Sequence, residues 1–193
     1  SKIKSLLTQT LSRRSVIKGG TVAALAASFP QIWIKEGWAQ GNFRNNPGSS
    51  GEIKLGFNYP QTGPYADEGA DEFRAYQLAV KHLNGEGDGG MLNTMKPSML
   101  KRNGILGKKV VYATGDTQTN TDKARSSAKR LIEKDNVIMV TGGSSSGPAV
   151  AVQALCQEMG IIFMAGLTHS NDTTGKDKKR YGFRHFFNAY MSG

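Results

Sequence analysis

The chain has 193 residues, of which 38% are hydrophobic, and its formal net charge is +10. This length allows one domain with or without an extension, and the apolar fraction is too high for a disordered chain. The charge alone would suggest nucleic acid or an anionic surface as a partner. However, residues 1–39 contain six basic side chains and one acidic one, a net charge of +5. Half of the excess therefore lies in the first fifth of the chain and needs its own explanation.

The N-terminal segment has the layout of an export signal. The sequence SRRSVIK at 12–18 is similar to the twin-arginine signal, in which paired arginines are followed by apolar residues and a lysine. A mildly apolar stretch follows at 21–34. Small residues place the cleavage after Ala39, with Ala27 as the alternative. The competing interpretation of this segment is a basic amphipathic helix that lies on a membrane.

Beyond the signal, strands alternate with helices. Residues 40–51 read as a flexible linker. Apolar runs alternate with segments of helical spacing. The apolar runs predict strands at 53–59, 109–114, 136–141 and 160–165, and a fifth strand at 183–187. The spacing between them predicts a helix from Asp67 with Phe73, Tyr76, Val80 and Leu83 on its inner face, a helix capped by Asn120 or Thr121, and a helix from Pro148 to Met159. This order predicts an α/β fold, with a doubly wound, mostly parallel sheet and helices on both faces.

The segment 85–107 interrupts this alternation. It is rich in glycine, asparagine, lysine and methionine, and basic residues continue to Lys109 without an acidic one between 96 and 109. This run is either a docking patch or a solvated loop, and charge runs usually face water. The mature chain shows no other basic stripe with aromatic residues, so we expect no nucleic-acid partner.

Several classes of site are disfavoured by composition. The single cysteine, Cys156, excludes an internal disulfide and a CxxC site, and it lies where a small core residue is expected. Three histidines at 82, 169 and 185 are too scattered for an HExxH zinc site. The P-loop and GxGxxG fingerprints are absent. We therefore expect no catalytic residues, no metal and no cofactor.

Ligands of parallel sheets bind beyond the carboxyl ends of the strands. That rule selects four loops, at 61–69, 116–119, 142–147 and 166–170. The loop 142–147 has three serines and precedes a helix, so its backbone N–H groups suit a carboxylate. A capped turn in which Ser146 satisfies the helix end explains it equally well. Asp116 is interpreted as the cap of a turn rather than as a ligand contact.

The ordered set of motifs resembles the type I periplasmic solute-binding proteins of ABC importers, the leucine/isoleucine/valine-binding family. The resemblance spans residues 52–193. It rests on Thr62-Gly63-Pro64 with Gly69, on Gly107-Lys108-Lys109-Val110 leading to Asp116, on Ser145-Ser146 before a helix, and on Gly160-Ile161-Ile162-Phe163 leading to Leu167-Thr168-His169. It implies that 52–193 is an incomplete N-terminal ligand-binding lobe, cut before the second lobe.

The resemblance also implies ligand contacts. It places the ligand carboxylate at Ser146, or at Ser145 if the helix is offset by one, and further contacts at Leu167 and His169 with Thr168 between them. His169 stands where the family commonly has a hydroxyl residue, which disfavours a standard branched-chain ligand. Glu68, with Tyr65 nearby, stands where the family usually has an aromatic residue. A carboxylate there suits a ligand with an extra positive charge or an amide donor.

The implied function is that of the extracytoplasmic substrate-binding component of an ABC transporter, located in the periplasm. Its expected partners are a small amino-acid-like ligand, an ABC permease in the inner membrane and, for export, the twin-arginine translocase. The alternative is a ligand-sensing receptor of the same fold. An exported α/β enzyme that uses Cys156 or His169 is less favoured, because no nucleophile stands beside a base oriented by a carboxylate.

Overall fold

The computed structural model describes residues 51–86 and 104–192. The expected export signal, all but the last residue of the expected linker, and most of the segment 85–107 lie outside these ranges. Within the two ranges no helix combines the length and the apolar character that crossing a membrane requires.

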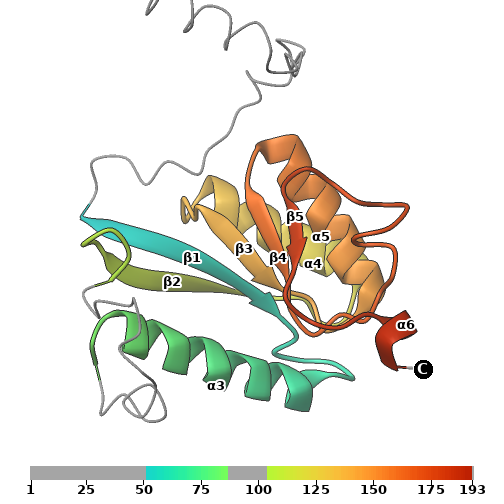
Figure 1. Ribbon diagram of the computed structural model, residues 1–193, viewed down its shortest axis with the longest axis horizontal. Helices are drawn as coiled ribbons and strands as arrows, with labels where there is room; N and C mark the ends of the chain where they lie inside the picture. The colour runs from blue at the N-terminus through green and yellow to red at the C-terminus, as the bar shows by residue number, and fades with distance from the viewer. Residues whose placement is uncertain (1–50, 87–103, 193) are drawn as a thin grey trace, which may run out of the picture. The chain divides into compact units, whose positions relative to one another are not determined.

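The described residues form one sheet of five parallel strands in the order β2-β1-β3-β4-β5 (Figure 1). The strands are β1 (Glu52–Tyr59), β2 (Lys109–Asp116), β3 (Met139–Gly142), β4 (Ile162–Ala165) and β5 (Gly182–Arg184). Every strand pair is parallel, so the carboxyl ends of all strands meet at one edge of the sheet. The order reverses direction at β1, which pairs with β2 on one side and with β3 on the other. The predicted doubly wound α/β fold is confirmed.

Helices cover both faces of the sheet. The helix α3 (Ala66–Leu83) packs on β1 and β2, while α4 (Thr121–Glu133) and α5 (Ser146–Met159) pack on the opposite face (Figure 1). A last short helix, α6 (Ala189–Ser192), follows β5. Asn120 caps α4, because its side-chain oxygen accepts hydrogen bonds from the backbone N–H groups of Asp122 and Lys123 at 3.0 and 3.1 Å.

The core has one cluster on each face. On the α4 and α5 face, the spacing of the apolar residues after Asn120 predicts one helix face. These residues are at most 1% exposed and pack against Phe163 and Cys156; they are Ala124, Ala128, Leu131 and Ile132. On the α3 face, aromatic rings stack in pairs, with centroids 4.6 Å apart for Phe57 and Tyr76 and 4.9 Å apart for Tyr59 and Phe73. Both predicted helix faces are confirmed.

Several predicted element boundaries are wrong. The helix α5 begins at Ser146 rather than at Pro148, because the first helical turn needs no backbone N–H donor and Pro148 fits its third position. The strand β2 is longer than predicted and ends at Asp116. The strands β3 and β4 start later, at Met139 and Ile162.

The fifth strand is also shorter than predicted and ends at Arg184 rather than at 187. Its pairing with β4 ends at the Ala165–Arg184 pair. Beyond this point, the Phe187 carbonyl accepts a hydrogen bond from the Arg184 guanidinium at 3.3 Å.

The only cysteine in the sequence, Cys156, lies on α5 with no exposed surface. Burial raises the pKa of its thiol to about 12. We therefore expect no labelling of the native protein by iodoacetamide at pH 8, and complete labelling in urea, as followed by intact mass. Rapid labelling of the native protein at this position would contradict the assignment of Cys156 to the core.

Candidate functional site

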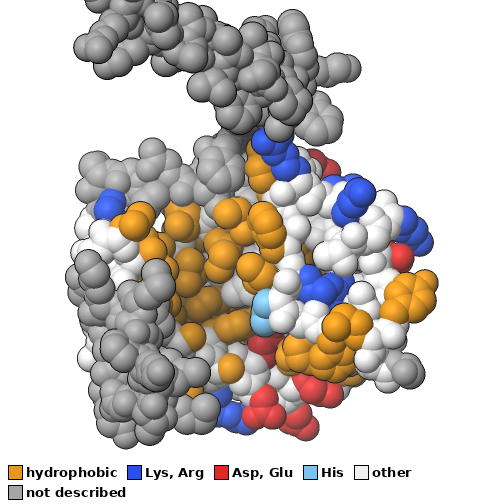
Figure 2. Space-filling view, viewed as in Figure 1, with side chains coloured by type: hydrophobic (Ala, Val, Ile, Leu, Met, Phe, Trp, Pro, Cys, Tyr) orange, Lys and Arg blue, Asp and Glu red, His pale blue; other side chains and the backbone are white. Residues whose placement is uncertain are grey.

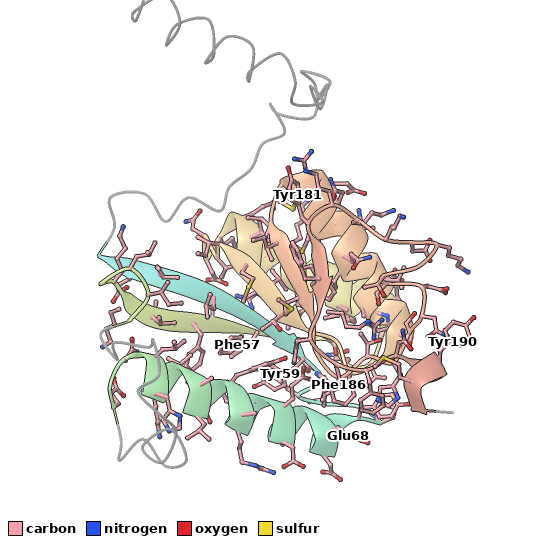
Figure 3. All side chains as sticks on the ribbon, in the orientation of Figure 1. Phe57, Tyr59, Glu68, Tyr181, Phe186 and Tyr190 are labelled. Atoms are coloured by element: carbon pink, nitrogen blue, oxygen red, sulfur yellow. The ribbon has the colours of Figure 1, made fainter. Side chains whose placement is uncertain are left out.

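A cleft of about 500 Å³ opens at the carboxyl ends of the strands. This volume falls within the roughly 300–1,000 Å³ that is typical of small-molecule sites. Its lining comes from the segments that follow β1, β3, β4 and β5, and consists of Tyr65, Glu68, Ser144, Ser145, Ser146, Leu167, His169 and Phe186. Six of the seven residues predicted as ligand contacts thus meet in one cleft. Figure 3 labels two of the lining residues, Glu68 on α3 and Phe186 after β5.

The Gly/Ser loop leads directly into α5. Ser145 is the N-cap residue, with extended backbone angles, and its side chain makes no capping hydrogen bond. The hydroxyl of Ser146, the first helical residue, instead accepts a hydrogen bond from Thr168 at 3.4 Å. The capped-turn interpretation is therefore not what the structure shows. The N-terminus of α5 borders the cleft and keeps N–H groups that favour an anion.

Thr168 is the predicted contact that does not line the cleft. It has no exposed surface, and besides its bond to Ser146 it accepts a hydrogen bond from the Ser170 backbone N–H at 3.4 Å. Its geometry suits a support beneath the cleft rather than a direct contact.

His169 is exposed and lies against two phenylalanine rings. Its centroid is 5.3 Å from that of Phe186, nearly parallel, and 4.7 Å from that of Phe187. Sequence reasoning missed Phe186, because the phenylalanine-rich run was read as a strand. The side chain of His169 is held by aromatic packing, and its backbone carbonyl accepts a bond from Ala189 N–H at 2.9 Å.

The N-terminal end of α3 brings an acidic side chain to the cleft. Glu68 is exposed in the first turn of α3, next to Asp67, and Tyr65 immediately precedes the helix with 42% of its surface exposed. Figure 2 shows acidic side chains gathered over the N-terminal end of α3. The lining of the cleft therefore includes both a carboxylate and a helix N-terminus.

Asp116 ties together the loops that follow β1 and β2. One of its carboxylate oxygens accepts bonds from the backbone N–H groups of Gln61 at 2.9 Å, Thr62 at 3.3 Å and Gln118 at 2.9 Å. The Thr62 hydroxyl donates to the other oxygen at 2.7 Å. Partial burial raises the pKa of Asp116, but these bonds outweigh that effect and hold it below its ordinary value. Asp116 organises a turn, as predicted.

Sequence reasoning missed a buried carboxylate behind the cleft. Glu72 on α3 is 5% exposed and accepts hydrogen bonds from the Tyr76 and Ser144 hydroxyls. Burial raises its pKa, and those two bonds together with the charge of His185 offset the rise only in part. The signal was available, since Glu72 shares one helix stripe with Tyr76 and Val80 at a spacing of four.

Arg184 was missed as well. Its guanidinium donates to the carbonyls of Thr168, at 2.8 Å, and Ser170, and to the hydroxyl of Thr173. These bonds fix the loop that carries Leu167 and His169. Desolvation lowers the pKa of Arg184. Arg184 takes part in none of the ion pairs among the described residues. Its hydrogen bonds go to carbonyl and hydroxyl oxygens, which are uncharged.

Comparison with known proteins agrees with this architecture. A Leu/Ile/Val-binding protein homolog of Brucella abortus is 33% identical over 115 residues, which are 60% of this chain and 25% of that protein. The structure of the branched-chain amino acid transporter substrate binding protein LivJ from Streptococcus pneumoniae, in complex with isoleucine, matches with a TM-score of 0.55 and 28% identity over 71% of this chain and 34% of that one. A branched-chain amino acid transporter protein from Rhodopseudomonas palustris shares the fold, with a TM-score of 0.61 at 22% identity, over 72% of this chain and 33% of that one.

The chain spans between a quarter and a third of the lengths of these relatives. The Brucella relative is named as a Leu/Ile/Val-binding protein and the Streptococcus protein as a substrate binding protein, and both names agree with the expectation of a non-catalytic site. The family described as periplasmic binding protein matches residues 52–193, which is every described residue but the first and nearly three-quarters of the sequence. On these grounds, the chain belongs to the periplasmic binding protein family.

Proposed function

We propose that residues 52–193 form the N-terminal lobe of a protein that captures an amino acid or a related small amphipathic solute for an ABC permease. The observation that carries this proposal is the polarity of the cleft. Ser146 and the N-terminus of α5 suit a ligand carboxylate, and Glu68 suits a cationic or amide group of the same ligand. No chemistry is required, since closure of two lobes around the solute is the signal to the permease.

The remaining parts of the proposal concern export. The twin-arginine pattern at 12–18 supports a signal peptide at 1–39, a linker at 40–51 and a periplasmic location. The binding protein would then cross the inner membrane through the twin-arginine translocase before it meets its permease.

The ligand class is tested by a thermal-shift screen of the full-length mature protein against amino acids, amides and polyamines. A ligand that binds only the folded state raises the melting temperature. We expect shifts with amino-acid-like solutes, and the largest shifts with those that carry a second cationic or amide group. The absence of a shift with every amino-acid-like solute would exclude this ligand class.

Glu68→Gln is expected to weaken binding of the solute that shifts the melting temperature most by about 10- to 150-fold, since a charged hydrogen bond contributes about 1.5–3 kcal/mol and each 1.4 kcal/mol is about tenfold. Isothermal titration calorimetry measures the change. Asp67→Asn is the matched control, because Asp67 is exposed in the same helical turn but does not line the cleft. Unchanged affinity in Glu68→Gln would overturn the role assigned to Glu68.

A further inference from the structure

The buried carboxylate of Glu72 lies directly behind the cleft. Although it is on the same helix as the exposed Glu68, it is 5% exposed and does not line the cleft. A buried carboxylate needs partners, and each of its oxygens has one. The Tyr76 hydroxyl donates to Oε1, and the Ser144 hydroxyl donates to Oε2 at 3.0 Å.

Glu72 also lies against the loop that follows β4. A Cβ atom on Gly166 would come within 2.3 Å of Glu72 Oε1 and within 3.2 Å of the Gly142 carbonyl oxygen. Gly166 N–H donates to that same carbonyl at 2.9 Å. The carboxylate therefore lies between α3 and the two loops that supply most of the cleft.

The contact with Ser144 fixes the direction of a hydrogen bond inside the cleft. A serine hydroxyl has one proton and two lone pairs. Ser144 lines the cleft but gives its proton to Glu72 behind it. Only lone pairs of Ser144 then remain for a ligand, so this position accepts hydrogen bonds and does not donate them.

Ser146 has the opposite polarity. It accepts a hydrogen bond from the buried Thr168 hydroxyl at 3.4 Å, so its own proton remains available to the cleft. The two serines are two residues apart in sequence, yet one is prepared to donate and the other to accept. The side of the cleft that accepts hydrogen bonds thus comprises Ser144 and Glu68.

We propose that Glu72 is a positioning residue, which holds the Ser144 hydroxyl as an acceptor for a nitrogen donor on the ligand. This inference rests on the proposed function. It adds Ser144, an uncharged side chain, to Glu68 as a second residue that selects for a nitrogen donor on the ligand. The ligand class that it names is an amino-acid-like solute with an additional N–H group.

The test measures the dissociation constants of L-lysine and L-norleucine, which differ by one terminal amine, for the full-length mature protein by calorimetry. L-Glutamine and L-methionine form a second pair, of similar side-chain length, in which only glutamine has side-chain N–H donors. In the wild type we expect tighter binding of the solute with the added nitrogen in at least one pair. Ser144→Ala and Glu72→Met should each reduce that preference about tenfold, and the double variant should reduce it no further than Ser144→Ala alone. Glu72→Gln, which keeps one acceptor oxygen, should retain part of the preference.

The control is Asp71→Asn, which neutralises a carboxylate of the same helix whose side chain is 73% exposed. It should leave the preference unchanged. If Glu72→Met weakens both members of a pair equally, or its effect adds to that of Ser144→Ala, Glu72 has only a general structural role and the inference is wrong. If the wild type prefers the added nitrogen but both variants keep that preference, the inference fails while the proposed function stands.

In the remaining outcome, the wild type binds none of the four solutes and the proposed ligand class fails. A measurement without ligand then still tests the hydrogen bond between Ser144 and Glu72. Ser144 stabilises the charged carboxylate, so Ser144→Ala should raise the pKa of Glu72 in a carbon-13 titration of the side-chain carboxyl. The other groups that face it, Tyr76 of α3 and His185 after β5, are unchanged in this variant. An unaltered pKa would show that the hydrogen bond does not exist in solution, and would overturn the inference by itself.

Discussion

Gly142→Ala should lower the free energy of unfolding by about 3 kcal/mol, because it adds a steric clash to a strained backbone. Gly142 ends β3 with φ +130°, and a Cβ atom there would come within 2.1 Å of the Asn58 carbonyl oxygen. Neither partner can give way, since Asn58 is 2% exposed and pairs with Gly142 in the middle of the sheet. Urea unfolding of the full-length protein, followed by circular dichroism, measures the loss.

The matched control for this substitution is Gly107→Ala. Gly107 also has a positive φ, +75°, but no atom lies within 4 Å of an added Cβ. Only the conformational cost of about 1 kcal/mol is expected there. Equal losses in the two variants would show that backbone strain, and not the close approach of β1 and β3, determines the need for glycine at 142.

Arg184→Lys is expected to destabilise the protein by about 2–3 kcal/mol and to weaken ligand binding about tenfold. Lysine keeps the charge but lacks the planar fork that reaches the oxygens of Thr168, Ser170 and Thr173 at once. The loop with Leu167 and His169 then loses its anchor. Urea unfolding and calorimetry with the best solute of the thermal-shift screen measure the two effects.

Arg180→Lys is the control, because Arg180 is exposed a few residues earlier in the same segment. It should change neither stability nor affinity by a measurable amount. If Arg184→Lys behaves like this control, the bonds of Arg184 do not hold the loop and its charge alone is sufficient.

Much of the fold could be predicted because its core positions repeat with the period of their elements. The buried face of α4 and the aromatic face of α3 follow directly from residues spaced three and four apart. The start of α5 could not be predicted with the same accuracy. Pro148 suits any position of the first helical turn, so the sequence does not distinguish between a start at 146 and a start at 148.

The parts of the site that could be predicted are loops with a distinctive composition. The parts that could not be predicted are single side chains whose hydrogen-bond partners lie far away in the sequence. The Gly/Ser loop and the residues 167–169 were selected by their places after strands, and the structure brings them to one cleft. Glu72 follows the exposed acidic residues Asp67 and Glu68 closely, which favours a solvated interpretation, although its position on the apolar stripe indicates burial. Two of the backbone carbonyls that Arg184 bonds lie 14 and 16 residues before it. Every residue has a carbonyl oxygen, so the sequence does not indicate which of them a side chain will bond.

The place of β1 between β2 and β3 has a consequence for biosynthesis. It is the first described strand to leave the ribosome, yet its neighbours β2 and β3 come from residues 109–116 and 139–142. Until residue 142 has been synthesised, at least one edge of an apolar strand stays open, and such edges invite pairing with other chains. The nascent chain should therefore depend on chaperones during this interval, and slower translation of residues 60–142 should increase its aggregation.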